Sequence, residues 1–325
     1  MHKKILIIHN PSIGSDNIGD DIIMEYCNEV ITECFPSSEY KRIDLPTHLP
    51  VKEKYKRVMD KANYQLVCGT NILCPHIEKY NLWKMNGGVD LSAYKNIILL
   101  ACGWNSYSDD VSEESLKLYK SVLSKECIHS VRDHYTEEWM KKMGFSNVVN
   151  TNCITLWNCS GDNKDYLFEK KSTSVVFSLT AHRKNIQRDV FFINLLISNY
   201  EKIYFWPQGD KDLDYLKTLM PKLTNGRCIK VLKRSLKAYE RLLDKNDIDY
   251  IGTRLHGGIH AFNKGIRTII IAVDNRASEI GKDTGLTVVR NDEVEQKLSQ
   301  LINSKIDVHL NIQSDNINTW KKQFD

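Results

Sequence analysis

Short apolar runs alternate with amphipathic segments along the whole chain. In the first half, the apolar runs have the length and composition of buried strands, and they lie at 3–9, 65–69, 96–102, 127–131 and 147–150. Two segments between them repeat their apolar residues with the period of a helix, at 20–33 and 135–143. The pattern therefore predicts strands that alternate with helices.

The second half repeats this alternation. Apolar runs typical of buried strands lie at 174–179, 202–206, 228–232, 249–252 and 268–273. Helical periodicity is found at 190–200, 236–244, 254–264 and 293–301. Alternation of this kind from end to end predicts an α/β protein with parallel sheets.

The 325 residues exceed what one typical core contains, so we predict two Rossmann-like, doubly wound domains facing a cleft. The polar segment 157–171 is predicted to be a linker. The N-terminal domain then spans 1–160 and the C-terminal domain spans 172–305. The remaining residues, 306–325, are predicted to pack back as a tail.

The composition limits the kinds of partner and the cellular compartment that the sequence is compatible with. The net charge of +4 favours anionic substrates or a phospholipid surface, and it is too small to indicate nucleic acid. Nine cysteines without a Cys-x-x-Cys spacing indicate a reducing compartment, so we expect a cytoplasmic protein. No apolar run approaches the length of about 18 residues that a membrane-spanning helix needs.

The stretch 250–274 contains the highest concentration of candidate functional residues. It reads as strand, helix and strand, which places Arg254 and His256 at a helix N-terminus on the carboxyl edge of a sheet. A helix N-terminus and a guanidinium both favour anions. The alternatives are an ion pair of Arg254 with Asp249 and a histidine on the helix surface. A zinc protease motif is incomplete, because Gly257 stands where that motif has its glutamate.

Two other polar turns follow predicted strands. His182, Arg183, Lys184 and Arg188 follow the strand at 174–179 and form a second candidate anion site; the alternative is a solvated loop. The turn 17–20 lacks the Lys-Ser/Thr of a phosphate loop, and local chemistry favours helix capping by its Asn or Asp.

Several blocks resemble the polysaccharide pyruvyl transferase family. The segment TRLHGGIHAFNKGIRTIII at 253–271 is similar to its C-terminal signature, NIGD at 17–20 to its Asn-x-Gly-Asp block, and SVRDHYT at 130–136 to a third block. The chain departs from the family at 68–71, where Cys-Gly-Thr-Asn replaces a Gly-Gly-Gly-Asn or Gly-Gly-Gly-Ser turn. A turn with one glycine approaches a ligand less closely, which weakens the prediction of acceptor contacts there.

The resemblance implies a glycosyltransferase-B-like fold and a transferase that takes phosphoenolpyruvate as donor. The acceptor it implies is a sugar of a surface polysaccharide, usually on a lipid carrier, and the product is a cyclic pyruvate ketal. It implies no cofactor and no metal, with the donor mainly on the second domain. We also expect peripheral contact with the inner membrane face; self-association stays open.

The resemblance also implies roles for individual residues. His256 would be the general acid and base, supported by Arg254. The residues expected to bind the donor are Arg183, Gln208, Arg254, Leu255, His256, Gly257 and Ser278. The residues expected to bind the acceptor or to be structural are Asn17, Gly19, Asp20, Asn71, Trp104, Arg132 and Asp133. For Trp104 the alternative is a packed aromatic ring, and for Arg132 and Asp133 it is an ion pair with a helix cap.

Two other functions fit the same pattern. A sugar-nucleotide glycosyltransferase would use the same helix N-termini for a diphosphate. A non-catalytic glycan-binding protein would keep the fold, although the presence of Arg183, Arg254 and His256 together argues against it. A fold alone does not choose among the three.

Overall fold

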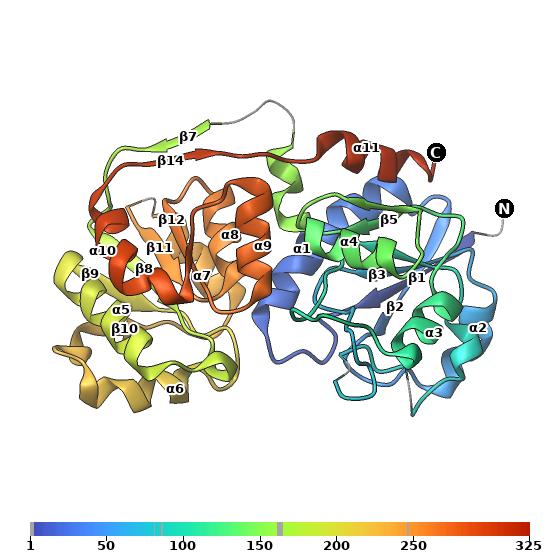
Figure 1. The fold of residues 1–325 in the computed structure, drawn as a ribbon, viewed down its shortest axis with the longest axis horizontal. Helices are drawn as coiled ribbons and strands as arrows, with labels where there is room; N and C mark the ends of the chain where they lie inside the picture. Colours follow the sequence, from blue (N-terminus) through green and yellow to red (C-terminus); the bar gives the residue numbers. More distant parts are fainter. Residues whose placement is uncertain (1–2, 81, 86, 161–164, 246) are drawn as a thin grey trace. The chain divides into compact units, whose positions relative to one another are not determined.

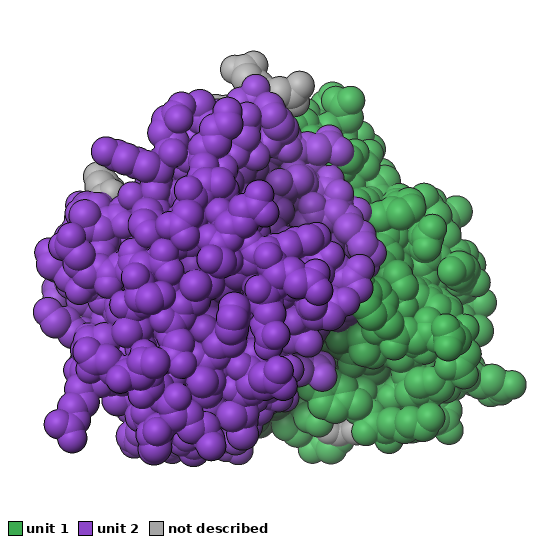
Figure 2. Space-filling view, turned by 60° about the vertical axis from the view of Figure 1, so that its left-hand side comes forward, with its two compact units in different colours: residues 1–15, 23–160, 312–325 green, residues 16–22, 161–311 purple. Residues whose placement is uncertain are grey.

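The computed structural model describes residues 3–80, 82–85, 87–160, 165–245 and 247–325 (Figure 1). The chain forms two compact units, which Figure 2 distinguishes by colour. Unit 1 consists of 1–15, 23–160 and 312–325, and unit 2 consists of 16–22 and 161–311. Both units are built on parallel sheets, which confirms the predicted α/β class.

In the described part of unit 1, a parallel sheet has the strand order β2-β1-β3-β4, and β5 and β6 form a parallel pair. The strands are β1 (Lys4–Asn10), β2 (Tyr40–Pro46), β3 (Tyr64–Cys68), β4 (Ile97–Leu100), β5 (His129–Val131) and β6 (Val148–Asn150). The helices are α1 (Ile18–Cys34), α2 (Lys56–Asp60), α3 (Glu113–Val122), α4 (His134–Lys142) and α11 (Ser314–Lys322). Short 3-10 helices lie at Glu53–Tyr55, Leu91–Ala93 and Ile154–Cys159.

Apart from the edge strand β2, the strands of unit 1 are largely buried, as the continuous apolar runs predict. Along β1, Ile7 packs into one core cluster, whereas Leu6 and Ile8 pack into another, because alternate side chains of a strand point to opposite faces. Helices α1 and α11 contribute to the second cluster, and α2, α3 and α4 contribute to the first. Trp320 of α11 is fully buried in this core.

In the described part of unit 2, a parallel sheet has the strand order β10-β9-β8-β11-β12-β13 (Figure 1). Its strands are β8 (Ser174–Ser178), β9 (Lys202–Phe205), β10 (Ile229–Val231), β11 (Asp249–Gly252), β12 (Thr268–Ala272) and β13 (Val288–Arg290). Strands β7 (Asp165–Phe168) and β14 (Ile306–His309) form a separate antiparallel pair. The strand order reverses between β8 and β11, and ligands of such sheets bind at the carboxyl ends beside this reversal.

The helices of unit 2 connect consecutive strands. They are α5 (Ile186–Asn199), α6 (Asp212–Leu219), α7 (Leu236–Leu243), α8 (Leu255–Asn263), α9 (Asn275–Thr284) and α10 (Val294–Asn303). Short 3-10 helices lie at Ala181–Arg183, Met220–Lys222, Gly226–Cys228 and Asn291–Glu293. Helix α5 packs against α6 and α10, while α8 packs on β11 and β12 and α9 packs on β12 and β13.

The structure corrects several predicted elements. The segment 157–171 is not a continuous loose linker: Trp157 is buried, Asp165–Phe168 is strand β7, and residues 161–164 lie outside the described residues. Helix α5 begins at Ile186 rather than near 190, because the Asn185 side chain accepts from the Arg188 N–H and caps the helix one turn earlier.

Two histidines are enclosed in the core of unit 1. Burial lowers the pKa of His9 to about 4, although its hydrogen bond with Gln65 acts in the opposite direction. Burial lowers the pKa of His129 to about 4 in the same way. The contacts of His129 fit a neutral ring, because Nδ1 accepts from the Leu99 N–H at 3.3 Å and Nε2 donates to the Ser124 carbonyl at 2.8 Å.

We therefore expect acid to destabilise unit 1. Between pH 6.5 and 4 the unfolded chain binds protons at these histidines and the folded chain does not, so stability falls as the pH falls. At pH 5 the loss should be about 2 kcal/mol for each histidine. Urea unfolding at pH 7.5 and at pH 5 measures this loss of stability. A His129→Gln variant should lose about half of the pH dependence that His9 and His129 contribute, whereas His134→Gln, at an exposed site, should keep it. Equal slopes in all three proteins would contradict the assignment.

Candidate active site

A pocket opens in unit 2 at the carboxyl ends of the strands, beside the reversal of strand order. Its walls come from the loops after β8, β9, β11 and β12 and from the first turn of α1. The residues that line it are Asn17, Gly19, Thr180, Gln208, Thr253, Arg254, Leu255, His256, Val273, Asp274, Arg276 and Ala277. It is where the sequence pattern predicts an anionic ligand.

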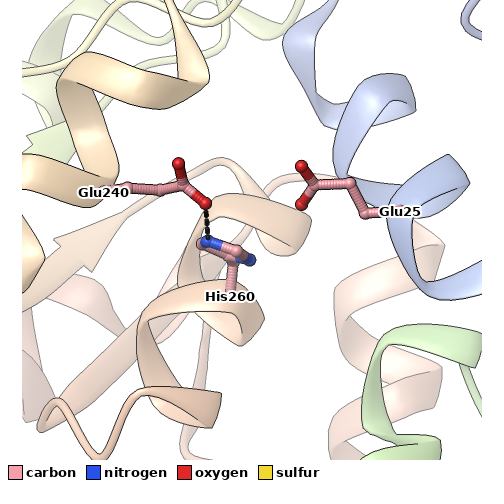
Figure 3. A group of neighbouring side chains, drawn as sticks. All are labelled: Glu25, Glu240 and His260. Atoms are coloured by element: carbon pink, nitrogen blue, oxygen red, sulfur yellow. Dashed lines mark ion pairs between the residues drawn. The ribbon is translucent and has the colours of Figure 1, made fainter. Parts of the chain in front are cut away.

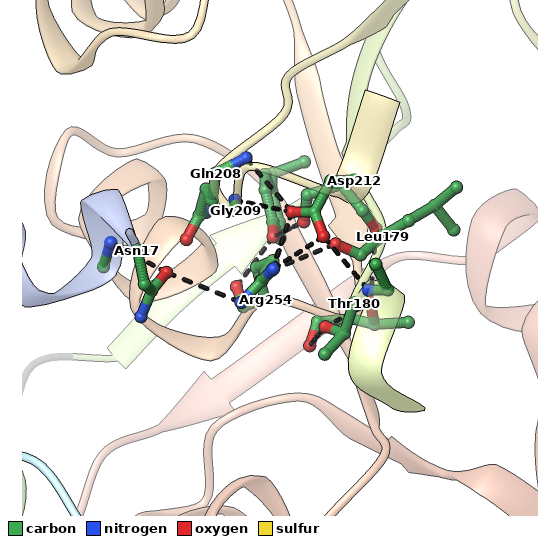
Figure 4. Close-up of polar contacts among 12 residues, drawn as sticks. Asn17, Leu179, Thr180, Gln208, Gly209, Asp212 and Arg254 are labelled. Atoms are coloured by element: carbon green, nitrogen blue, oxygen red, sulfur yellow. Dashed lines mark hydrogen bonds and ion pairs between the residues drawn. The ribbon is translucent and has the colours of Figure 1, made fainter. Parts of the chain in front are cut away.

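Arg254 does not pair with Asp249, the alternative partner considered from the sequence. Its guanidinium is bound by Asp212, with Nη2 at 2.6 and 2.7 Å and Nε at 3.1 Å from the carboxylate oxygens (Figure 4). Asp249 instead pairs with Arg267 at 3.0 Å. Asp212 is fully buried and the Arg254 side chain is 10% exposed, so the charge of Arg254 is balanced inside the protein.

Asp212 also orders the turn that precedes it. Its carboxylate accepts hydrogen bonds from the backbone N–H groups of Ala181, Gln208 and Gly209. Gly209 is required by the close approach of Arg254, because a Cβ there would lie 2.5 Å from Nη2. Asp212 therefore joins the loops after β8 and β9 to the arginine that follows β11.

The first turn of α1 contributes Asn17 and Gly19 to this pocket. The Asn17 side chain caps α1 by accepting from the Gly19 N–H at 3.1 Å, as the capping alternative proposed. The same oxygen lies 3.5 Å from Nη1 of Arg254. The sequence grouped these two residues with the acceptor site, whereas the structure places them beside the donor candidates. Asp20, the next residue, is buried and does not line the pocket.

The N-terminus of α8 faces the pocket without a side-chain cap. Arg254 occupies the cap position, and a guanidinium has no acceptor to offer the helix N–H groups. Leu255 and His256, the first two residues of α8, line the pocket, and His256 is 6% exposed. This helix end can therefore receive an anion next to an imidazole.

Gln208 provides a second, independent indication of a ligand. Its side chain is 1% exposed and lines the pocket, and Nε2 has no hydrogen-bond partner among the described residues. A buried amide without a partner is unfavourable unless a ligand or water satisfies it. Gly257 makes room for this side chain, since a Cβ there would lie 2.1 Å from Nε2.

Arg276 is a pocket residue that the sequence pattern does not single out. It lies in the first turn of α9, and its Nε and Nη2 lie 3.1 and 2.5 Å from one carboxylate oxygen of Asp274. Asp274 also caps α9 by accepting from the Arg276 N–H. Arg276 could have been predicted from the sequence because, like Arg254, it follows shortly after a buried strand.

The pKa of His182 indicates the sign of the electrostatic potential in this region. Although residue 182 is exposed by surface area, neighbouring atoms partly desolvate the ring and lower the pKa of His182, and the charges of Arg254, Arg276 and Arg183 lower it further. Asp274 acts in the opposite direction and more weakly than each arginine. The imidazole therefore experiences a net positive potential, which is the potential that an anionic ligand needs.

Three of the predicted donor residues do not line the pocket: Arg183, Gly257 and Ser278. Arg183 is exposed, and the Ser278 hydroxyl turns back toward the Asp274 carbonyl at 3.5 Å. Arg188, from the second candidate anion site, is buried and donates to Asp189 and Asn291. The three cationic residues and the histidine that follow β8 are thus not brought together as one site.

The predicted acceptor residues of unit 1 form a structural cluster. Arg132 is 1% exposed and donates to Asp133, to the Trp104 carbonyl and to Asn71. Asp133 caps α4 by accepting from the Thr136 N–H at 2.7 Å. Trp104 is fully buried and stacks on Trp139, so it offers no face to a sugar. These contacts match the structural alternatives for Trp104, Arg132 and Asp133.

The turn after β3 has a backbone conformation that favours glycine, although a threonine occupies position 70. Gly69 has φ 49° and Thr70 has φ 58°, both in the left-handed region. A Cβ at position 69 would lie 2.2 Å from Ile23, which explains the glycine. A β-branched residue in this region is strained by about 1–2 kcal/mol, so Thr70 stores strain at the carboxyl edge of this sheet.

His260 lies one turn after His256 on α8. Its ring is 3.6 Å from the Glu240 carboxylate (Figure 3). Burial lowers the pKa of His260 to about 4, and Lys264 lowers it further, so the ring is neutral near pH 7 and the contact is not a charge pair. His260 and His256 are both 6% exposed, and what separates them is the pocket, which His260 does not line.

Two solved structures to which the chain is similar hold bound nucleotides. UDP-GlcNAc 2-epimerase from Methanocaldococcus jannaschii, solved with UDP-GlcNAc and UDP, shares 12% identity over the full length of both chains with a TM-score of 0.56. The Escherichia coli heptosyltransferase WaaC with ADP shares 12% identity over 92% of this chain and 95% of its own, with a TM-score of 0.41. The first of these shows that the fold is glycosyltransferase-B-like.

A search of curated protein sequences found no match. In the described part of the chain, every helix is too short or too polar to span a bilayer. Residues 17–275, in contrast, match the family model described as polysaccharide pyruvyl transferase. This match covers most of the chain and implies a pyruvyl donor and a polysaccharide acceptor. The chain is therefore a transferase that belongs to the polysaccharide pyruvyl transferase family.

Proposed function

We propose that the enzyme transfers the enolpyruvyl group of phosphoenolpyruvate to a sugar of a surface polysaccharide or its lipid-linked precursor and closes it to a cyclic pyruvate ketal. The observation that carries the proposal is the pocket of unit 2. There an uncapped helix N-terminus, an unsatisfied buried amide at Gln208, and the guanidinium groups of Arg254 and Arg276 surround His256.

The chemistry of the donor fits this set of groups. Phosphoenolpyruvate carries a carboxylate and a phosphate on one enol carbon, so it needs two places for anions. The first turn of α8, with Gln208 and Nη1 of Arg254, suits one of them. Most of the Arg254 guanidinium is held by Asp212, so we expect it to direct hydrogen bonds and not to supply a net charge.

His256 is proposed as the general acid and base. A proton is added to the methylene carbon, which leaves a positively charged carbon that one sugar hydroxyl attacks. Phosphate then departs, and the second hydroxyl closes the ring as both hydroxyl protons are lost. An imidazole can give and accept protons near neutral pH, which suits it to these steps. The scheme requires no cofactor and no metal.

The acceptor is proposed to be lipid-linked, which would bring the enzyme to the cytoplasmic face of the membrane as a peripheral protein. The net charge of +4 is compatible with an anionic phospholipid surface. Asn71, near Arg132, remains a proposed acceptor residue, because its side chain is only partly buried.

Donor binding can be tested by thermal unfolding. At a hundredfold excess over its dissociation constant, phosphoenolpyruvate should stabilise the protein by about 2.7 kcal/mol. For a chain of this length that corresponds to a rise in melting temperature of a few degrees. UDP- and ADP-sugars should produce no shift. A shift with a nucleotide sugar and none with phosphoenolpyruvate would favour a glycosyltransferase instead.

A further inference from the structure

The charges that line the donor pocket are arranged as two arginine–aspartate pairs. Arg254 is held by Asp212, and Arg276 is held by Asp274. The two pairs differ in burial. Asp212 is fully enclosed and also accepts three backbone N–H groups, whereas the Arg276 side chain is 21% exposed and the Asp274 side chain is 8% exposed.

This difference determines which arginine can exchange its partner. Removing Arg254 from Asp212 would leave a buried carboxylate without its counter-charge, which is strongly unfavourable. Arg276 lines the pocket and its pair with Asp274 is less buried, so a ligand oxygen can replace Asp274 at lower cost. Asp274 would keep its second role, the cap of α9, through its other oxygen.

We propose that Arg276 binds the second anionic group of the donor, and that this group replaces Asp274 at the guanidinium. The inference rests on the proposed function for the identity of the donor, but it concerns an anion site that phosphate alone can probe. Nε and Nη2 of Arg276 both lie within hydrogen-bond distance of one oxygen of Asp274. This edge of the guanidinium can instead take two oxygens of a phosphate or carboxylate through two parallel hydrogen bonds.

The potential at His182 supports this assignment. Arg276 acts on that imidazole more strongly than Asp274 does, so the pair is not electrically neutral toward the pocket. Arg254 acts on the same ring, which places both guanidinium groups within electrostatic range of one side chain. Because Asp212 balances the charge of Arg254, we expect the attraction for a second anionic group to come mainly from Arg276.

Inorganic phosphate is the probe, with binding measured by calorimetry and by thermal unfolding. Arg276→Gln should weaken phosphate binding by about tenfold or more, since a charged hydrogen-bonded contact is removed. Arg276→Lys should give an intermediate loss, because the charge stays and the fork is lost. Asp274→Asn should strengthen phosphate binding several-fold, since asparagine still caps α9 and the competing charge is gone.

Arg290 provides the matched control. It pairs with Asp292 at 3.1 Å across the same spacing of two residues, and both side chains are about two-thirds exposed and away from the pocket. Arg290→Gln should leave phosphate affinity unchanged. In turnover assays Arg276→Gln should raise KM for phosphoenolpyruvate about tenfold while kcat stays within about threefold of the wild type.

The outcomes separate this inference from the proposed function. Unchanged phosphate affinity in Arg276→Gln, weaker binding in Asp274→Asn, or no measurable phosphate binding by the wild type would each overturn it. If phosphate behaves as expected while phosphoenolpyruvate does not bind, the anion site stands and the donor assignment fails.

Discussion

Asp212→Asn should destabilise the protein by about 3–5 kcal/mol. Asparagine has nearly the same shape, but it leaves the charge of Arg254 in a buried place without a counter-charge. Its amide would also direct a donor at some of the N–H groups of Ala181, Gln208 and Gly209 that the carboxylate now accepts. Both effects act on unit 2, because every one of these groups belongs to it.

Urea unfolding measures this loss, with Asp210→Asn as the control. Asp210 lies two residues earlier, is exposed, and should change stability by less than about 0.5 kcal/mol. A loss below about 1 kcal/mol for Asp212→Asn would show that water reaches Arg254 and replaces the carboxylate. In that case Arg254 could offer its full charge to the donor. Arg254, and not Arg276, would then be the arginine that exchanges its carboxylate partner for the donor.

His256→Gln should reduce kcat by about 10²–10⁴-fold and keep donor binding. This is the range expected when a side chain that transfers a proton in the rate-limiting step is removed. Glutamine keeps polar atoms at this site but cannot exchange a proton near neutral pH. Turnover would be followed as phosphate released from phosphoenolpyruvate and as the mass gain of a ketal on a lipid-linked oligosaccharide acceptor.

His260→Gln is the matched control for this measurement. It lies on the same helix with the same exposed fraction of 6%, but it does not line the pocket. We expect its kcat to stay near that of the wild type and its effect to be on stability. Wild-type turnover in His256→Gln would remove this histidine from the mechanism, and His182, with its lowered pKa, would become the next candidate for the proton donor.

Much of the fold could be predicted from the sequence because parallel strands have a simple signature. A strand buried on both faces, such as β12 (Thr268–Ala272), is apolar at every position after its first. Strand β2 (Tyr40–Pro46) does not show this signature: it lies at a sheet edge, and exposed Lys41 and Arg42 interrupt its apolar pattern. Whether a strand lies at the edge of a sheet depends on which other strands pair with it, and the local sequence does not show this pairing.

The site can be predicted where one short segment contains it, but not where distant segments build it. Arg254 and His256 are two residues apart and follow a strand, so their position at the sheet edge could be inferred. The partner of Arg254 is 42 residues away at Asp212, and nothing local distinguishes this aspartate from the nearer Asp249. Which carboxylate pairs with which arginine is decided by the packing of loops from three strands.

Ser278 and Arg276 show the same limit within one helix. Both follow β12 closely, and the family resemblance favours the serine. The phase of α9 instead places Arg276 and Ala277 in the pocket wall, while the Ser278 hydroxyl turns toward the backbone of its own helix. Helix phase depends on where the helix begins, and here the cap at Asp274 sets it.

The presence of residues 16–22 in unit 2 has a practical consequence for cutting the protein into fragments. A fragment covering only 161–311 would be continuous in sequence, yet it would lack Asn17 and Gly19, one side of the donor pocket. It would also lose the backbone pairing of Asn17 with Gly209 and the hydrogen bond from Ile18 to Gln208. Unit 2 is therefore built from two separate segments of the chain, and a short peptide from the N-terminal region would be needed to complete it.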